Sequence, residues 1–245
     1  MNTDPSGPPD QSPRRILIHG ASGRIGQILL RLAAERGDLQ VVAAVSQKVG
    51  QRVINGVPQF SARELAGVPA FDVAIDFSRN EGFDGILDLC LQRGAALVSG
   101  TTGLDERQRT AIGDAGARIP ILWASNFSLG VAVLTDLVER AARALPGWDC
   151  DIVEAHHNRK QDAPSGTALT LGAAIESAGA HPRYASLRAG DIVGEHTVQF
   201  TATGERIELI HRAGNRDIFA RGALHAASRL AGRAPGAYRL GELLE

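Results

Sequence analysis

The stretch RILIHGASGRIGQILLRLA, residues 15–33, decides the fold of this 245-residue chain. Residues 15–19 form an apolar run with β-branched side chains, which predicts a buried strand. After Gly20, apolar residues recur at helical spacing, at Ile25, Leu29, Leu32 and Ala33. A strand joined to a helix by a short glycine turn is the opening unit of a parallel α/β sheet. We expect Gly37 to end this helix as its C-cap.

The glycine turn, GASGRIG at residues 20–26, predicts a dinucleotide-binding site. It fits GxxGxxG, because Ser22 stands where the commoner GxGxxG motif has its second glycine. Glycines let the turn close tightly and let backbone N–H groups approach a pyrophosphate at the helix N-terminus. The alternative interpretation is a glycine-rich turn that only packs the helix against the sheet.

Strands and helices alternate through the first half of the chain. The pattern predicts strands at residues 39–45, 71–77, 95–99 and 119–123, and helices at 80–93 and 105–115. This alternation is typical of βαβ units in a parallel sheet. Two small polar loops, GTTG at residues 100–103 and ASNFS at 124–128, follow predicted strands, where ligands bind in open α/β sheets. Taken singly, each loop could also be a simple turn.

The pattern changes after a long amphipathic helix predicted at residues 129–145. The remaining predicted elements are a strand at 152–155, a helix at 165–178, a hairpin of strands at 196–203 and 206–211, and a helix at 217–230. We therefore predict an α/β protein with a Rossmann-like parallel-sheet cofactor domain and a second, smaller α+β mixed-sheet domain for substrate binding. The first comprises residues 14–127 plus 214–245, and the second residues 128–213. Residues 1–13, polar and rich in proline, predict a disordered tail.

Composition excludes several classes of protein. Hydrophobic residues make up 44% of the chain, as in ordinary globular proteins, and the formal charge of -1 disfavours a nucleic-acid partner. No apolar stretch reaches the roughly 18 residues that a membrane span needs. The two cysteines, Cys90 and Cys150, read as buried thiols without metal-ligand spacing, which fits a reducing cytoplasm.

A second stretch, EAHHNRKQDAPSGT at residues 154–167, carries the chemistry. Two histidines, an arginine and a lysine lie close together just before a predicted helix. The N-terminus of a helix presents unpaired N–H groups that suit a carboxylate or phosphate. Lys160 is one of only two lysines, with Lys48, in a chain that otherwise uses arginine. We interpret the segment as the place where a small acidic substrate is held and protonated; the alternative is a solvated basic loop.

These segments together resemble the 4-hydroxy-tetrahydrodipicolinate reductase family, also called dihydrodipicolinate reductases, of the diaminopimelate route to lysine. The resemblance rests on GASGRIG at 20–26, SGTTG at 99–103, SNFSLGV at 125–131, EAHHNRKQDAPSGTA at 154–168 and RAGDIVGEH at 188–196. It implies NAD(P)H-dependent reduction of 4-hydroxy-tetrahydrodipicolinate, a small dicarboxylate, to tetrahydrodipicolinate with loss of water. It also implies a homotetramer.

The resemblance further implies the roles of individual residues. His156 is expected to be the general acid/base and Lys160 the second proton donor, while His157, Gly166 and Thr167 hold a substrate carboxylate. The residues expected to line the cofactor are Gly20, Ala21, Ser22, Gly23, Arg24, Ile25, Gly100, Thr101, Thr102, Ala124, Ser125, Asn126 and Phe127. The chemistry agrees, because histidine can supply a proton near neutral pH and a cationic helix N-terminus suits a diacid.

The end of the second predicted strand bears on the choice of cofactor. An acidic residue there usually binds the ribose hydroxyls of NAD, whereas this chain has Ser46. Ser46 could donate to a 2′-phosphate and Lys48 could neutralise it, so the sequence favours NADPH over NADH.

Two segments are shorter than is common in the family, at residues 49–65 and 178–188. In the second of these, HPRYAS replaces a stretch that commonly adds a strand, so we expect an altered sheet in the second domain. Other interpretations stay open: a different NAD(P)-dependent reductase of a small acid, or a dinucleotide-sensing regulator without catalysis, which His156 and Lys160 argue against. A metal site at His156 and His157 is disfavoured, because adjacent strand residues point in different directions.

Overall fold

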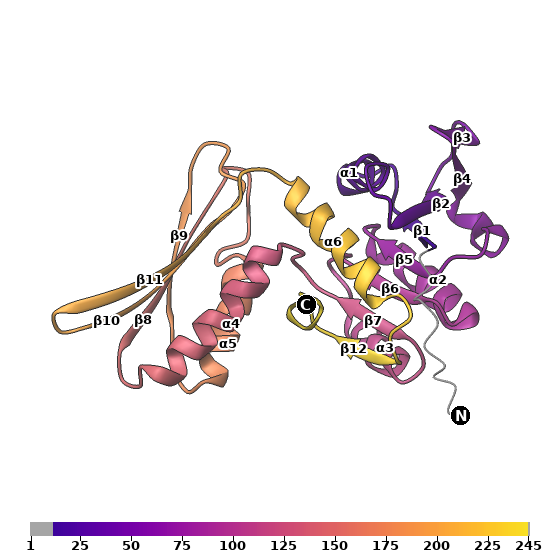
Figure 1. Ribbon diagram of the computed structural model, residues 1–245. Coiled ribbons are helices and arrows are strands. Elements are labelled where there is room, and N and C mark those ends of the chain that lie inside the picture. The colour runs from indigo at the N-terminus through magenta and orange to yellow at the C-terminus, as the bar shows by residue number, and fades with distance from the viewer. Residues whose placement is uncertain (1–11, 245) are drawn as a thin grey trace, which may run out of the picture. The chain divides into compact units, whose positions relative to one another are not determined.

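The structure, a computed structural model, describes residues 12–244, so nearly all of the predicted tail at residues 1–13 lies outside the described residues. The chain divides into two compact units, drawn in Figure 1. The first unit runs up to Trp123 and includes Ala223–Tyr238; the second comprises Ala124–Gly222 and Arg239–Glu245. The second unit thus takes in residues 124–127, 214–222 and 239–245, which the sequence pattern placed in the cofactor domain.

An eight-stranded sheet forms the centre of the first unit, with strand order β12-β7-β6-β5-β1-β2-β4-β3. Neighbouring strands are parallel, except that β3 runs antiparallel to β4. The strands are β1 (Arg14–His19), β2 (Leu39–Ser46), β3 (Val53–Ile54), β4 (Val57–Ser61), β5 (Val73–Asp76), β6 (Ala96–Ser99), β7 (Pro120–Trp123) and β12 (Gly236–Tyr238). Because β1, β2, β5, β6 and β7 are parallel, the loops that follow them emerge at one edge of the sheet.

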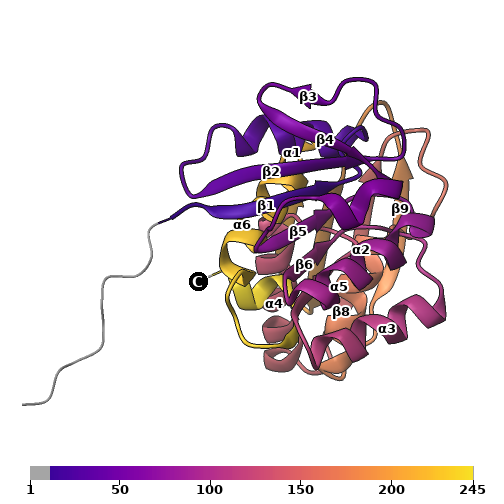
Figure 2. The same cartoon turned by 90° about the vertical axis from the view of Figure 1, so that its right-hand side faces the viewer.

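Helices cover both faces of this sheet. They are α1 (Arg24–Ala33), α2 (Asn80–Arg93), α3 (Glu106–Gly116), the part of α6 (Asp217–Leu230) from Ala223 onward, and the 3₁₀ helix η1 (Ala62–Gly67). Figure 2 shows α2 and α3 side by side on one face, with α1 on the other.

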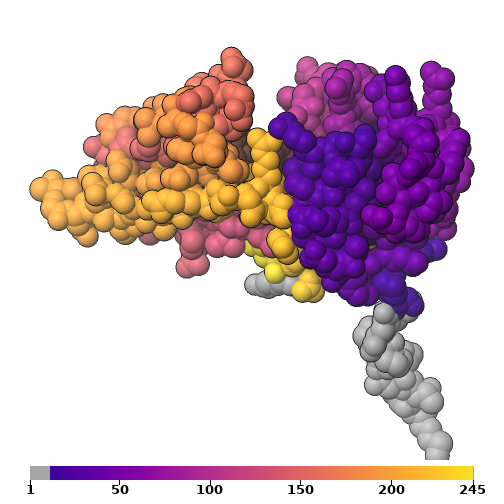
Figure 3. Space-filling model, turned by 90° about the horizontal axis from the view of Figure 1, so that it is seen from above, coloured from indigo at the N-terminus to yellow at the C-terminus, as the bar shows by residue number. Residues whose placement is uncertain are grey.

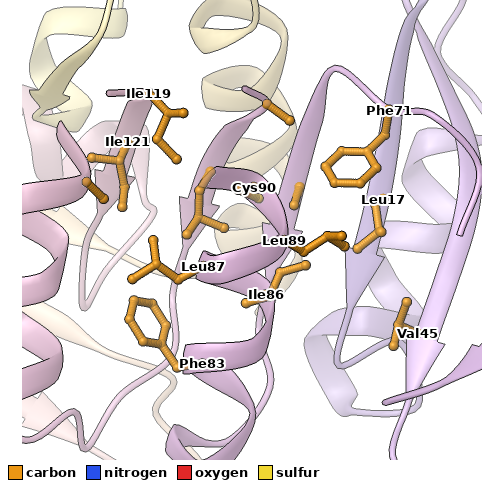
Figure 4. Close-up of a cluster of buried hydrophobic side chains, with 14 of the residues drawn as sticks. Leu17, Val45, Phe71, Phe83, Ile86, Leu87, Leu89, Cys90, Ile119 and Ile121 are labelled. Carbon is orange, nitrogen blue, oxygen red and sulfur yellow. The ribbon is translucent and has the colours of Figure 1, made fainter. Parts of the chain in front are cut away.

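The core beneath α2 and α3 follows from helical spacing. Phe83, Ile86 and Cys90 recur on one side of α2 and are fully buried against strand residues such as Leu17 and Ile121 (Figure 4). Burying each large apolar side chain stabilises the fold by about 1.5–3 kcal/mol. This core therefore fixes the sheet whose edge carries the glycine loop.

The second unit is a four-stranded sheet of order β11-β10-β8-β9 with two helices on one face. Its elements are α4 (Leu129–Ala144), β8 (Asp149–His156), α5 (Gly166–Ser177), β9 (Arg183–Arg188), β10 (Glu195–Ala202), β11 (Glu205–Arg212) and the 3₁₀ helix η2 (Leu240–Leu243). Strands β8 and β9 are parallel, and the other pairs are antiparallel. The hairpin of β10 and β11, orange to yellow, reaches the surface of this unit in Figure 3.

Alternation along β8 builds the core of the second unit. Cys150 and Ile152 point to the helices and pair with Phe200 and Val198 of β10, and all four are buried. Burial raises the pKa of the Cys150 thiol to about 11. Glu154 and His156 follow on the same face, two and four residues beyond Ile152, so the buried side of β8 changes from apolar to polar at its carboxyl end.

The structure confirms the predicted α/β class, the parallel sheet and the smaller mixed sheet. Helices α2 and α6 have the predicted bounds, and β10 and β11 form the predicted hairpin. The prediction for Gly37 was wrong: α1 ends at Ala33, with right-handed Ala34 as its C-cap. Bonds from Glu35 and Arg36 to carbonyls three residues back satisfy the helix end, so no left-handed glycine is needed there.

The sequence pattern also missed β3, β4, β9 and β12. Strand β9 lies where the shortened segment 178–188 was expected to alter the sheet, and it pairs with β8 in register from Arg183 to Arg188. Helix α5 forms the crossover between these parallel strands. Most side chains of β9 are exposed at the sheet edge, so the segment carries no apolar alternation that could reveal it. Within residues 12–244, no helix is both long and apolar enough to cross a membrane.

Candidate active site

Glycine loop 20–26 lies at the carboxyl edge of the first unit's sheet, between β1 and α1. Gly20 has φ +80°, and a Cβ there would lie 2.4 Å from the carbonyl oxygen of Phe77. A Cβ at Gly26 would lie 2.3 Å from the carbonyl oxygen of Gly20. Both positions therefore require glycine. Gly20 needs it for its backbone conformation, and both residues need it because a carbonyl oxygen lies where a Cβ would be.

The N-terminus of α1 is open in the way a pyrophosphate site requires. Gly23 is the N-cap, and no side chain among the described residues caps the helix. The N–H groups of the first turn therefore remain available to an anionic ligand. The hydroxyl of Ser46, at the end of β2, accepts a hydrogen bond from the Ser22 N–H at 3.1 Å and so joins the loop to the strand. Lys48 follows at the surface, in the loop after β2.

A buried carboxylate, which the sequence analysis did not identify, supports this edge of the sheet. Asp76, at the end of β5, is fully buried and accepts four hydrogen bonds. The donors are His19 Nδ1 at 2.8 Å, the Ser78 N–H at 3.1 Å, the Ser99 hydroxyl at 2.9 Å and the Thr101 hydroxyl at 2.7 Å. Burial alone would raise the pKa of Asp76, but these hydrogen bonds, led by that of His19, lower it.

The loop after β6 is held by this network. Thr101 is 1% exposed, its hydroxyl donates to Asp76, and its carbonyl accepts from Trp123 Nε1 at 2.9 Å. The side chain of Thr101 therefore faces the protein, which leaves its backbone and the exposed Thr102 for the predicted cofactor contact. A Cβ at Gly100 would lie 2.3 Å from the Phe77 ring, so any side chain there would displace that ring.

In the second unit, His156 ends β8 and is 8% exposed. Its Nδ1 lies 2.5 Å from Glu154, two residues earlier on the same face of the strand. Arg188 of β9 makes a bidentate pair with Glu154, at 2.8 and 2.9 Å. Burial alone would raise the pKa of that carboxyl, but hydrogen bonds from Arg188, Ser186 and His156 outweigh it and lower the pKa to about 2.

The segment after β8 carries the second predicted proton donor. Lys160 forms an ion pair with Asp162, with 2.8 Å between Nζ and Oδ2, and its side chain is about one-fifth exposed. His157 lies between the two predicted proton donors. Burial and the neighbouring cations, of which Arg159 acts most strongly, lower the pKa of His157, so its ring is neutral near pH 7.

The N-terminus of α5 follows this segment. Ser165 is the N-cap: its hydroxyl accepts from the Ala168 N–H at 3.2 Å and lies 3.1 Å from His196 Nε2. Burial lowers the pKa of His196 to about 4, which keeps that ring neutral. The exposed Gly166 and the half-buried Thr167 form the first turn, so the predicted carboxylate site is an accessible helix N-terminus.

One predicted cofactor residue contacts a predicted substrate residue. Asn126 Nδ2 donates to the Thr167 hydroxyl at 2.8 Å, and Asn126 Oδ1 accepts from the Ser128 N–H at 2.8 Å. The amide thus fixes the orientation of Thr167. Ala124 and Ser125 precede it directly after β7, while Phe127 is 1% exposed, so its side chain belongs to the core.

The structure therefore gathers the predicted residues into two groups. Residues 20–25, Ser46 and residues 100–102 share the edge of the first unit's sheet, and His156, His157, Lys160, Gly166 and Thr167 lie in the β8–α5 junction with Asn126. The residues that sequence reasoning missed are Asp76, Glu154 and Arg188. Glu154 and Arg188 begin two of the motifs that carry the family resemblance, and the two-residue spacing of Glu154 from His156 places both on one strand face, but neither signal indicated a role.

Comparison with known proteins agrees with these observations. A sequence model of "Dihydrodipicolinate reductase, N-terminus" matches residues 14–127, and one of "Dihydrodipicolinate reductase, C-terminus" matches residues 130–244. The chain is 70% identical to the 4-hydroxy-tetrahydrodipicolinate reductase of Stenotrophomonas maltophilia strain K279a, over 96% of this chain and 100% of that protein. It is 65% identical to that of Xylella fastidiosa strain 9a5c, over 94% and 98% respectively.

Solved structures show the same fold. The dipicolinate-bound dihydrodipicolinate reductase from Paenisporosarcina sp. TG-14 superimposes with a TM-score of 0.79 at 22% identity, covering 95% of this chain and all of that one. A myo-inositol dehydrogenase from Corynebacterium glutamicum gives a TM-score of 0.60 at 14% identity, covering 88% and 87%. The two sequence models together span nearly all described residues, and the chain belongs to the dihydrodipicolinate reductase family.

Proposed function

We propose that this chain reduces 4-hydroxy-tetrahydrodipicolinate to tetrahydrodipicolinate with a reduced nicotinamide dinucleotide and loss of water, in diaminopimelate and lysine biosynthesis. Family membership and 70% identity over almost the whole chain support this activity. The observation that carries the proposal is the β8–α5 junction, where two proton-carrying side chains, His156 and Lys160, stand beside an accessible helix N-terminus. We also propose a homotetramer, as the resemblance to the family implies, and a cytoplasmic location, which fits the two buried thiols.

The substrate carries two carboxylates, and the junction offers suitable partners for one of them. The N–H groups at the start of α5 and the hydroxyl of Thr167 donate to its oxygens. Asn126 holds that hydroxyl in place. Because His157 is neutral near pH 7, it contributes a hydrogen bond rather than a charge. Lys160 supplies the positive charge of the site.

The open N-terminus of α1 and the glycines that bring the backbone close to it fit a nicotinamide dinucleotide, which supplies a hydride when bound. His156 then donates a proton to the substrate, since an imidazole can exchange a proton near neutral pH. Lys160 hydrogen-bonds the reacting end of the substrate and acts as the second proton donor. Loss of the 4-hydroxyl group as water precedes or accompanies the reduction.

We further propose that NADPH is the preferred cofactor. No acid stands at the end of β2, where it would repel a 2′-phosphate, and Ser46 has a hydroxyl there that is held at the glycine loop by Ser22. Lys48 lies two residues beyond, with an exposed side chain. A serine hydroxyl and an ammonium suit a phosphate as donors.

Lys48→Ala should raise the KM for NADPH by at least about 10-fold, because one charge-assisted contact contributes on the order of 1.5–3 kcal/mol. The KM for NADH should stay unchanged, since NADH has no phosphate at that position. Steady-state kinetics with each cofactor would measure both values in one preparation. An equal rise for both cofactors would mean that Lys48 does not distinguish them and would contradict the assignment.

The activity itself can be tested by coupling the chain to the preceding synthase. Pyruvate and aspartate semialdehyde would generate the substrate, and loss of reduced-nicotinamide absorbance would follow the reaction. We expect oxidation of NADPH that depends on both the synthase and this chain. If the rate did not exceed that of the mixture without this chain, the proposed activity would be wrong.

A further inference from the structure

A buried carboxylate, that of Glu154, contacts the proposed acid, His156. Glu154 is 1% exposed and shares the helix-facing side of β8 with Cys150 and Ile152, which are apolar and fully packed. An ionised group on such a face is unfavourable unless every oxygen is hydrogen-bonded. Buried ion pairs of this kind are weak contributors to stability, so folding alone does not account for the residue.

Both oxygens of Glu154 are saturated. Oε1 accepts from Arg188 Nη2 at 2.8 Å and from the Ser165 N–H at 3.2 Å. Oε2 accepts from Arg188 Nη1 at 2.9 Å and lies 2.5 Å from His156 Nδ1. The bidentate guanidinium keeps the carboxylate ionised and fixes its plane.

An ionised carboxylate can only accept hydrogen bonds, which decides the protonation of the imidazole. Nδ1 of His156 must carry a hydrogen to bond Glu154, so Nε2 is the nitrogen that gains and releases the exchangeable proton. A Cβ on Gly194 would lie 3.0 Å from this Nε2. A side chain at position 194 would therefore crowd Nε2, and glycine keeps this edge of the ring free of that contact.

Arg188 also ties this pair to the segment that carries Lys160. Its Nη2 donates to the carbonyl oxygen of Asp162 at 2.5 Å, and the carboxylate of Asp162 pairs with Lys160. The Arg188 guanidinium thus holds both the Glu154 carboxylate and the backbone of Asp162, the residue that pairs with Lys160.

We propose that Glu154, held by Arg188, is a positioning residue for proton transfer: it fixes His156 with hydrogen on Nδ1 and presents Nε2 to the substrate. This role rests on the proposed function of His156 as the acid. Besides Glu154 itself, the titratable and charged groups that face the ring and its partner are His157, Arg188 and His196; Arg159, Lys160 and His211 act in turn on His157 or His196.

Glu154→Gln should lower kcat about 10- to 100-fold, the range seen when a partner that orients a metal-bound histidine is lost. KM for the substrate and for NADPH should change little. The limb of the kcat–pH profile in which activity falls with rising pH should move to lower pH, because no carboxylate then stabilises the imidazolium.

Asp151→Asn is the matched control. Asp151 lies on the opposite face of β8 and accepts two hydrogen bonds from Arg183 of β9, at 2.7 and 3.0 Å. The substitution therefore removes a carboxylate–guanidinium pair, here a more exposed one, between the same two strands without touching His156. A purely structural role for Glu154 would give both variants unchanged pH profiles, and that result would overturn the proposal.

A measurement on the unaltered chain covers the case in which Glu154→Gln does not fold. Imidazole nitrogen chemical shifts, assigned with His156→Gln, report which nitrogen carries the hydrogen. We expect neutral His156 to be protonated on Nδ1; protonation on Nε2 would refute the positioning role. If the unaltered chain is inactive, the proposed function is wrong. If the unaltered chain is active and Glu154→Gln leaves its pH profile unchanged, only the positioning role is wrong.

Discussion

His156→Gln and Lys160→Ala should each lower kcat by at least about 100-fold, the lower end of what a positioned proton donor contributes. Glutamine keeps the approximate size of the imidazole but cannot exchange a proton. Alanine at position 160 removes both the ammonium and its pairing with Asp162. NADPH affinity should stay close to that of the unaltered chain, because the glycine loop and Ser46 belong to the first unit.

Stopped-flow fluorescence of bound NADPH and steady-state turnover would measure these two quantities separately. Arg159→Ala is a suitable control, because it removes an exposed cation from the same segment. We expect only a modest effect on turnover from that change. Comparable losses in all three variants would show that total positive charge matters and that neither His156 nor Lys160 has a specific role. Loss of NADPH binding along with turnover would indicate a folding defect.

Asp76→Ala should destabilise the chain by about 3–5 kcal/mol, as expected when one partner of a buried, hydrogen-bonded pair is removed. The imidazole of His19 and the hydroxyls of Ser99 and Thr101 would lose their shared acceptor in a region that water does not reach. Because these donors lie at the end of β1, at the end of β6 and in the loop after β6, the loops at the cofactor edge should also loosen, which weakens NADPH binding.

Asp72→Ala provides the comparison within the same pair of strands. Asp72 precedes β5 and pairs with Arg15 of β1 at 2.6 Å, but both side chains are substantially exposed. Exposed ion pairs contribute about 1 kcal/mol or less. Urea unfolding of both variants near pH 7 would measure the difference. An equal loss in the free energy of unfolding for the two variants would show that the Asp76 network stabilises the fold no more than an exposed ion pair does.

The fold was largely accessible from the sequence because its signals are local. The run of residues 15–19 followed by the glycine turn predicted the first βα unit, and the helical pattern between two predicted strands gave α2 its observed bounds. Strand β9 escaped detection because an edge strand with exposed side chains has no apolar alternation. The prediction of Gly37 as the C-cap of α1 was wrong, because hydrogen bonds from the N–H groups of Glu35 and Arg36 satisfy the end of the helix before that residue.

The candidate site was accessible only in part. The motif at 154–167 indicated His156 and Lys160, since the chemistry of those side chains is visible in the sequence. The pairing of Glu154 with Arg188 is not, because it depends on β8 and β9 lying side by side although the two residues are 34 positions apart. The orientation of the Thr101 side chain was equally hidden in the sequence, because its hydroxyl bonds Asp76 at the end of a different strand.

The central claim is that the β8–α5 junction holds a dicarboxylate and presents His156 and Lys160 to it. A crystal structure of this chain with NADPH and dipicolinate would test it most directly. We predict one carboxylate of the ligand at the N–H groups of Gly166 and Thr167, with His156 Nε2 and Lys160 Nζ facing the ring. Dipicolinate bound elsewhere, or bound there with both side chains turned away from it, would contradict the account.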